Sequence, residues 1–406
     1  SGTLVASFDP NATNLIANGF VPTQGLFSSV GGWLETPARN AYSLFNASDP
    51  AWTGSEFVLY GTLPSGYYAI SFPPALAIFN PTTGLWRLAT TNGMPPFMGG
   101  GPGAGATPQI TVISNTVFVF NQPDPLSAMA TNVVAGRYNL QNDTWQTVSA
   151  PVITNGFPPY QISVEGVVAG TIIGRFGSYG APQYFKYNMA ADSWMVVNTN
   201  GQAATPNGVY FSAATETELL LAGVSMNGTT PSPTNLAAYN PLTDTWRPIS
   251  TNGFPNLRSP GQTKGFFSVW TGTELIVAYN SDNYTTGAYL AYRPSTDTWR
   301  SLNTYGAPVG SFWNGKEVGY AYLALTGVNG GQQQFAVVFN FYNPMADTWR
   351  STSAPNGPTL SSVGAGAPPQ AGVFWNGTDV SVFGTADSPK AYRFTPPVTV
   401  FFYSKP

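Results

Sequence analysis

Short runs of alternating apolar and polar residues follow one another along the whole chain, with Gly or Pro between them. In several places a Thr-Gly or Asn-Gly pair separates two such runs, as in 51–61, 269–279, 312–322 and 374–384. A tight Gly-containing turn between alternating segments predicts an antiparallel hairpin. No segment sustains the 3.6-residue apolar period of a helix. The pattern therefore predicts an all-β protein.

A second phrase recurs between these hairpins, with an aromatic residue seven positions before a Trp and usually an Asp two before it. It occupies 79–87, 138–146, 187–195, 239–247, 292–300 and 342–350. Its tryptophans, 49 to 59 residues apart, are Trp86, Trp145, Trp194, Trp246, Trp299 and Trp349. A period near fifty with four short strands per unit predicts the blades of a β-propeller.

The residues of this phrase suggest structural roles. Asn-Pro ends a strand, because Pro cannot donate to the ladder. The aspartates are predicted to hydrogen-bond backbone amides of the turn, as Asp and Asn commonly do; they are Asp143, Asp192, Asp244, Asp297 and Asp347. Each Trp is predicted to pack between neighbouring sheets, burying about 150–250 Å².

Counting the units predicts the size of the ring. The hairpin that opens each unit occurs near residues 52, 114, 166, 216, 272, 315 and 377. Degenerate copies of the second phrase, which keep its seven-residue spacing, occur at Phe8–Leu15 and Phe394–Phe401. We predict seven four-stranded antiparallel blades in residues 41–406, with eight or six blades as alternatives. Residues 1–40 are predicted to be an N-terminal extension or the strand segment that closes the ring.

The phrases Tyr-Asn-Pro, Asp-Thr-Trp and Trp-Thr-Gly resemble the bacterial form of the kelch repeat over roughly residues 42–403. The Gly-Gly pair of that family is missing, since Tyr60-Gly61 and Phe383-Gly384 keep one Gly and Ala278-Tyr279 keeps none. The resemblance implies a kelch-like propeller, and such modules mostly bind partners or accompany catalytic domains.

Composition excludes several classes of chemistry. The 406 residues include no Cys and no His, which excludes disulfides, thiolate sites, imidazole metal ligands and a Ser-His-Asp triad. Galactose-oxidase-like copper chemistry is excluded for the same reason. Charged residues make up 8% of the chain and the net charge is −3, which argues against nucleic-acid binding. No apolar run is long enough to span a bilayer. We expect no cofactor and no metal.

Residues that recur in every unit are predicted to be structural, so a catalytic site should use residues outside the repeat. The acids outside it are Asp9, Glu35, Asp49, Asp124, Glu165, Glu216, Asp282 and Asp387. Two of them meeting in the central funnel would support a glycosidase or lyase. A sialidase-like site has only a weak signal at 295–299, and no arginine cluster can be assigned. No catalytic residue is predicted.

Loops are better candidates for binding, at 61–75, 92–109, 121–135, 224–235 and 326–334. Aromatic and Met side chains that suit glycan stacking or protein docking are Tyr67, Tyr68, Phe72, Phe97, Met98 and Tyr284. Sequons for glycosylation occur at Asn11, Asn46, Asn142, Asn227, Asn283 and Asn376. An alternative is that the loops fold back over the ring.

A surface solubilised by Asn, Thr, Ser and Gln in place of charge favours an extracellular or envelope location. The sequence therefore predicts a secreted or cell-surface, non-catalytic propeller. It would bind a protein or glycan, or form part of an envelope or appendage assembly, and low surface charge would favour self-assembly. The alternative function is a carbohydrate-active enzyme with a carboxylate site.

Overall fold

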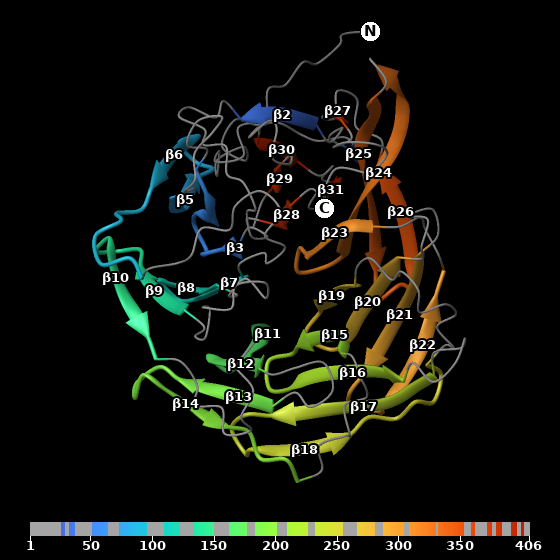
Figure 1. Ribbon diagram of the computed structural model, residues 1–406. Coiled ribbons are helices and arrows are strands. Elements are labelled where there is room, and N and C mark those ends of the chain that lie inside the picture. The colour runs from blue at the N-terminus through green and yellow to red at the C-terminus, as the bar shows by residue number, and fades with distance from the viewer. Residues whose placement is uncertain are drawn as a thin grey trace, which may run out of the picture.

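The strands form a ring of antiparallel sheets around a common centre (Figure 1). The computed structural model describes residues 26–28, 32–36, 51–63, 73–95, 109–121, 134–149, 162–176, 183–200, 209–225, 232–254, 266–280, 287–303, 308–329, 332–352, 359–361, 372–375, 379–383, 391–395 and 399–401. Of these residues, none belongs to a helix long and apolar enough to cross a membrane.

Four consecutive strands make up each of the first five sheets. The first two sheets are β3 (Ala51–Trp52), β4 (Phe57–Thr62), β5 (Pro74–Asn80) and β6 (Leu85–Leu88), then β7 (Gln109–Ile113), β8 (Thr116–Asn121), β9 (Val134–Asn139) and β10 (Thr144–Val148). The next two are β11 (Ile162–Val168), β12 (Thr171–Phe176), β13 (Gln183–Asn188) and β14 (Ser193–Val196), then β15 (Val209–Ala214), β16 (Leu219–Ser225), β17 (Ser232–Asn240) and β18 (Thr245–Pro248). The fifth is β19 (Phe266–Trp270), β20 (Leu275–Asn280), β21 (Gly287–Arg293) and β22 (Thr298–Leu302).

The remaining strands complete the ring with more varied pairing. One sheet contains β23 (Pro308–Trp313), β24 (Val318–Asn329), β25 (Gln332–Asn343) and β26 (Thr348–Thr352), with β27 (Thr359–Ser361) added to β25. Another contains β28 (Gly372–Trp375), β29 (Val380–Phe383), β30 (Ala391–Thr395) and, beside β30, the N-terminal β2 (Gly32–Thr36). β1 (Leu26–Ser28) and β31 (Thr399–Phe401) form a separate pair.

The predicted architecture of seven four-stranded blades is wrong. Among the described residues the structure shows six blades of the four-stranded kind, and the sheet built on β23–β26 has five strands. The physical cause is the length of β24 and β25, twelve residues each, which run past β23 and β26 and leave an edge that β27 pairs with. The sequence predicted a polar loop at 326–334, where these strands in fact continue.

The core lies between consecutive sheets. The first strand of each sheet contacts the first strand of the next, from β3 through β7, β11, β15, β19 and β23 to β28. Apolar clusters fill the spaces between sheets, and one of them joins Leu220 and Ala238 of one sheet to Leu275, Leu290 and Trp299 of the next. This stacking of sheets around a centre is a β-propeller.

Antiparallel order also separates two kinds of connection. In the six sheets from β3 to β26, the hairpins between first and second strands, and between third and fourth strands, lie at the same end of the sheet. The connections between second and third strands lie at the opposite end. The short repeated turns therefore share one end of the sheets, and the strand ends that flank the predicted loops at 121–135 and 224–235 lie at the other.

Candidate functional site

The turn between third and fourth strands is built by its asparagine. The Asn80 Oδ1 atom accepts hydrogen bonds from the backbone amides of Thr82 and Thr83 at 2.9 and 3.1 Å. The same pair of bonds recurs at Asn139, Asn188, Asn240 and Asn343. The sequence assigned this capping role to the aspartate; the asparagine fills it.

The aspartate of the phrase instead connects neighbouring sheets. All five aspartates have a positive φ, between 47° and 56°, and the equivalent residue of the first sheet is Gly84. In Asp297 the carboxylate accepts the Tyr292 hydroxyl at 2.8 Å and the backbone amide of Ser250, in the preceding sheet's exit segment, at 3.0 Å. Asp143 and Asp244 make the same contacts with Tyr138 and Thr90, and with Tyr239 and Asn198.

Four of the repeated tryptophans add a second connection to the preceding sheet. The indole N–H donates to a backbone carbonyl in the segment that leaves that sheet, in the pairs Trp145–Thr90, Trp194–Ser149, Trp246–Asn198 and Trp299–Ser250, at 2.7 to 3.0 Å. The Trp ring also packs on its cross-strand Tyr, with ring centroids 4.7 Å apart for Tyr292 and Trp299. The seven-residue spacing in the sequence is this cross-strand pair.

The Thr-Asn-Gly-Phe turn lies against the next sheet's Trp. Phe254 meets the Trp299 ring edge-on at 4.9 Å, and the Trp299 amide donates to the Asn252 carbonyl at 3.2 Å. Gly253 has φ +78°, and a Cβ there would lie 2.1 Å from the Trp299 carbonyl oxygen. A side chain at this position is therefore excluded by both conformation and contact.

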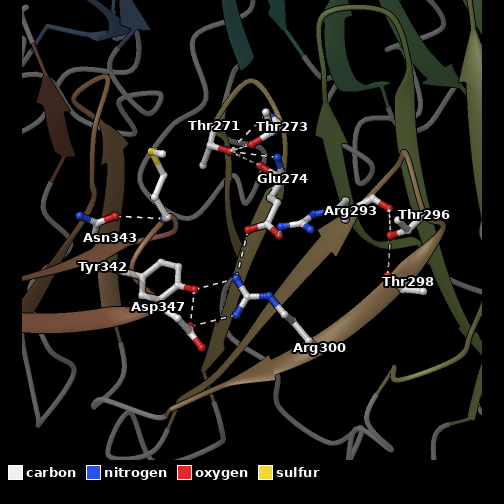
Figure 2. A network of polar contacts seen from close by, with 11 residues as sticks. Thr271, Thr273, Glu274, Arg293, Thr296, Thr298, Arg300, Tyr342, Asn343 and Asp347 are labelled. Carbon is white, nitrogen blue, oxygen red and sulfur yellow. Dashed lines mark hydrogen bonds and ion pairs between the residues drawn. The ribbon is translucent and has the colours of Figure 1, made fainter.

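A cation from the preceding sheet completes each Tyr–Asp pair. In Figure 2, Arg300 lies between Glu274 of its own sheet and the Tyr342–Asp347 pair of the next. Its Nη2 lies 3.1 Å from Glu274 Oε2 and 2.8 Å from the Tyr342 hydroxyl, and its Nη1 lies 2.9 Å from Asp347. Glu274 is buried and also binds Arg293 at 2.6 Å. The network therefore crosses from one sheet into the next.

Two sheets provide this cation from a different strand. Arg87, Arg247 and Arg300 follow the repeated Trp directly, but Gln146 and Met195 stand there in the second and third sheets. In those sheets the cross-strand partners of these residues are Arg137 and Lys186. Lys186 Nζ lies 3.2 Å from Asp244, and Arg137 interacts with Tyr187. Arg137 and Lys186 lie outside the recurring phrase, and their compensating role becomes apparent only once the strands are paired.

These contacts perturb the titration of their members. Burial, followed by the hydrogen bond to Asp347, raises the pKa of Tyr342 to about 12, and burial likewise raises the pKa of Tyr138 to about 12. The hydrogen bond from the Tyr342 hydroxyl, together with Arg300, holds the pKa of Asp347 below its usual value. Since every described sheet boundary with a Tyr–Asp pair has this arrangement, we assign it a structural role.

The acids outside the repeat do not gather among the described side chains. Glu165 is buried and binds Arg175 Nε at 2.8 Å, beside Tyr184. Glu216 is exposed in the turn at 215–218. Glu35 lies in β2, and the acids outside the described residues are Asp9, Asp49, Asp124, Asp282 and Asp387. No group of three acidic residues that could hold a metal ion occurs among the residues described.

Most predicted binding and modification residues fall outside the described residues. These are Tyr67, Tyr68, Phe72, Phe97, Met98 and Tyr284 among the loop side chains, and Asn11, Asn46, Asn227, Asn283 and Asn376 among the sequons. Asn142 is described and exposed, in the turn of the second sheet. Its Oδ1 atom accepts the Thr144 hydroxyl of the same sequon at 2.6 Å.

A feature that the sequence missed is an extension of the β24–β25 hairpin, formed by residues 323–329 and 332–337, which we call the arm. β24 pairs with β23 only as far as Tyr322, and beyond it pairs with β25 alone among the described strands. Residues 324–328 are all exposed, with Leu325 at 58% and Val328 at 67%. Figure 1 shows the two strands projecting at upper right. Leu325 pairs with Phe335 and Val328 with Gln333, so the register shift at residue 326 places both exposed apolar side chains on the same face of the strand.

Comparison with known proteins supports the fold alone. No protein-family model matches the sequence, and no curated protein matches it. Two oligogalacturonate lyase structures are similar, each at 10% identity and a TM-score of 0.51. One, in complex with manganese, matches over 92% of this chain and 99% of its own. The other, from Vibrio parahaemolyticus, matches over 93% and 98%. The WD40 domain of SCAP from fission yeast matches over 90% and 98%, at 9% identity and a TM-score of 0.45. The first two similarities agree with the strand topology, and the chain is a β-propeller.

Proposed function

We propose that this chain is a secreted or cell-surface propeller, of the kelch-like type that its repeats resemble, that works as a non-catalytic module in an envelope or appendage assembly. The observation that carries the proposal is the arm. The arm buries Phe335 and Val337 and is paired by β27 along part of β25, yet its β24 strand exposes Leu325 and Val328 to solvent. Such a surface becomes stable when a partner covers it.

The charge pattern of the arm supports the same function. No charged residue occurs from Val318 to Ala346. Natural edge strands are usually protected from association by charged side chains or Pro, and the arm has neither. The rest of the chain is sparsely charged as well, which suits a crowded surface layer whose contacts change little with salt.

The ion pairs and hydrogen bonds made by the described acidic residues support a role without catalysis. The repeated acids and cations bind each other at sheet boundaries, and the buried Glu165 is bound by Arg175. A hydrolase or lyase would instead need carboxylates directed at a shared substrate position.

A variant with a shortened arm tests the proposal. Replacing residues 326–334 with Asn-Gly joins Leu325 to its cross-strand partner Phe335 through a two-residue turn. In the source organism we expect the unaltered chain in the cell-surface fraction and the shortened chain released into the medium. Unfolding curves of both purified chains should nearly coincide, because residues 326–328 are exposed and, of the three pairs between β25 and β27, only Gln334–Ser361 is lost. Retention of both chains in the cytoplasm, or equal retention of both at the surface, would contradict the proposal.

A further inference from the structure

We propose that the arm pairs with the arm of a second copy of this chain, with the two β24 edges running antiparallel across a twofold axis; this inference rests on the proposed function. The edge consists of residues 323–329, which lack a neighbouring strand on one side among the described elements. Its centre is Thr326. An antiparallel pair centred there would turn two hairpins into one continuous four-stranded sheet.

The opposite edge of the same hairpin already accepts a strand. β27 pairs with β25 at the positions Gln334–Ser361, Phe335–Leu360 and Ala336–Thr359. Strand addition to the arm is therefore possible in this environment, and it leaves the β24 edge as the open one. In the same molecule β2 completes another sheet by adding to β30, although the two strands lie far apart in sequence.

Several properties of the edge favour an identical partner. It contains no charge, so two copies brought together do not place like charges opposite each other. It contains a register shift between Leu325 and Gly327, and such a bulge increases the local twist of the strand. A partner strand must match that twist and that length. A second copy related by a twofold axis has both by symmetry, and the contact then closes as a dimer.

The exposed side chains would be covered by the same contact. In antiparallel pairing about Thr326, Leu325 of one copy lies opposite residue 327 of the other, and Leu323 lies opposite residue 329. Leu325 and Val328, now 58% and 67% exposed, would each gain cross-strand neighbours. Burial of apolar area and completion of backbone hydrogen bonds then act together, as in other cases of strand addition.

Light scattering during size-exclusion chromatography of the purified full chain measures the association. We expect a dimer that dissociates on dilution. In this register Leu325→Lys places a charge two residues along the strand from its symmetry mate, and Val328→Lys places a charge opposite Ala324 of the other copy. Each replaces an apolar contact at the interface and should raise the dimer dissociation constant by roughly tenfold or more. Met345→Lys is the matched control, because Met345 is 96% exposed but lies in the turn after β25, outside the arm. It should leave the dissociation constant unchanged.

Oxidative crosslinking tests the register directly. The chain has no cysteine, so a single Thr326→Cys substitution introduces its one thiol. We expect Thr326→Cys to form a disulfide-linked dimer rapidly under mild oxidation, and Met345→Cys to form no disulfide link between copies. Circular dichroism and an unfolding curve establish that each variant is folded before it is compared.

The outcomes separate this inference from the proposed function. A monomeric wild-type chain, open-ended filaments, or a dimer unaffected by both lysine variants would overturn pairing between copies. If the wild type is monomeric while the shortened arm still loses surface retention, the arm binds a different protein, and the proposed function stands without this inference. If the shortened arm is retained at the surface and still dimerises, both proposals fail.

Discussion

The sheet of β23–β26 contacts its two neighbours in different ways. Toward β19–β22 the contact includes the polar network of Arg300, Tyr342 and Asp347. Toward β28–β30 it is aromatic, with Phe339 stacked on Phe394 at 4.8 Å and Phe312 parallel to Trp375 at 5.8 Å. Apolar residues also line the first boundary, and there hydrogen bonds between described side chains additionally fix the position of one sheet relative to the next.

The cause of this difference is a local change in the repeat. Phe394 occupies the place of the repeated Tyr, as its pairing with Val380 mirrors that of Tyr342 with Val318. It has no hydroxyl, and the segment after it has no Asp. Arg350, which corresponds to Arg300, instead binds Glu317 with two bonds and lies 4.2 Å over the Phe341 ring. Burial can therefore hold two sheets together, and the polar network adds directional contacts.

The largest effect is expected from removing a ring at the aromatic boundary. Phe339→Ala deletes a side chain that is 1% exposed and stacked on Phe394, and should reduce the free energy of unfolding by about 3–5 kcal/mol. Denaturant unfolding followed by Trp fluorescence measures the change. Leu242→Ala, at a position 71% exposed in a turn, is the control and should change it by less than about 0.5 kcal/mol. A loss below about 1 kcal/mol for Phe339→Ala would show that this boundary does not depend on stacking.

The ring and its sheet boundaries could be predicted from sequence because Trp, Tyr and Asp recur in nearly every unit. The partners of the acids could not, since Glu218 and Arg247 are 29 residues apart and meet only after the strands pair. Arg137 and Lys186 looked unrelated to the repeat for the same reason. The arm was missed because Gly327 and the glutamines at 332–334 are typical of a loop, and because the register shift between Leu325 and Gly327 interrupts the two-residue alternation that indicates a strand.

Two substitutions test the polar network: one removes the Tyr342 hydroxyl from the first boundary, and the other adds a hydroxyl to Phe394 at the second. Tyr342→Phe removes the donor to Asp347 and the acceptor for Arg300, and should cost about 1–2 kcal/mol of unfolding free energy. Phe394→Tyr places a hydroxyl at a fully buried position whose phrase lacks the Asp, and should also destabilise, by about 1–3 kcal/mol. Urea unfolding of the two variants measures both. A neutral Tyr342→Phe would show that aromatic packing alone defines this boundary.

The same network predicts how stability depends on pH. Tyr342 and Tyr138 have pKa values raised to about 12, above about 10 for an unfolded Tyr. Their contribution is fully present below about pH 10 and is lost as the pH rises through the folded pKa. The lowered pKa values of Asp143 and Asp347, each due first to its Tyr hydrogen bond, give stability that is present above about pH 4 and lost as the pH falls through the folded pKa.

With no histidine in the chain, the free energy of unfolding should be nearly constant from about pH 5 to about pH 9. Urea midpoints across the pH range measure the profile. Asp347→Asn should flatten part of the acid limb, because it removes one of the carboxylates that titrate there. A decline centred near neutral pH would contradict the assignment of stability to these Tyr–Asp pairs.

The smallest effect concerns the position of the cation within a sheet. Lys186→Met removes the partner of Asp244 and should cost no more than about 1 kcal/mol, since Asp244 is partly exposed. Adding Met195→Arg in the same chain returns a cation to the strand that carries it in the fourth and fifth sheets, directly across from residue 186. If the network requires a cation opposite each Tyr–Asp pair, the double variant should regain most of the stability lost by Lys186→Met. Met195→Arg alone should then change stability little, because Lys186 already occupies the site. If the stability change of the double variant equals the sum of the two single changes, a cation at residue 195 does not replace the one at residue 186, and the strand that carries the cation matters.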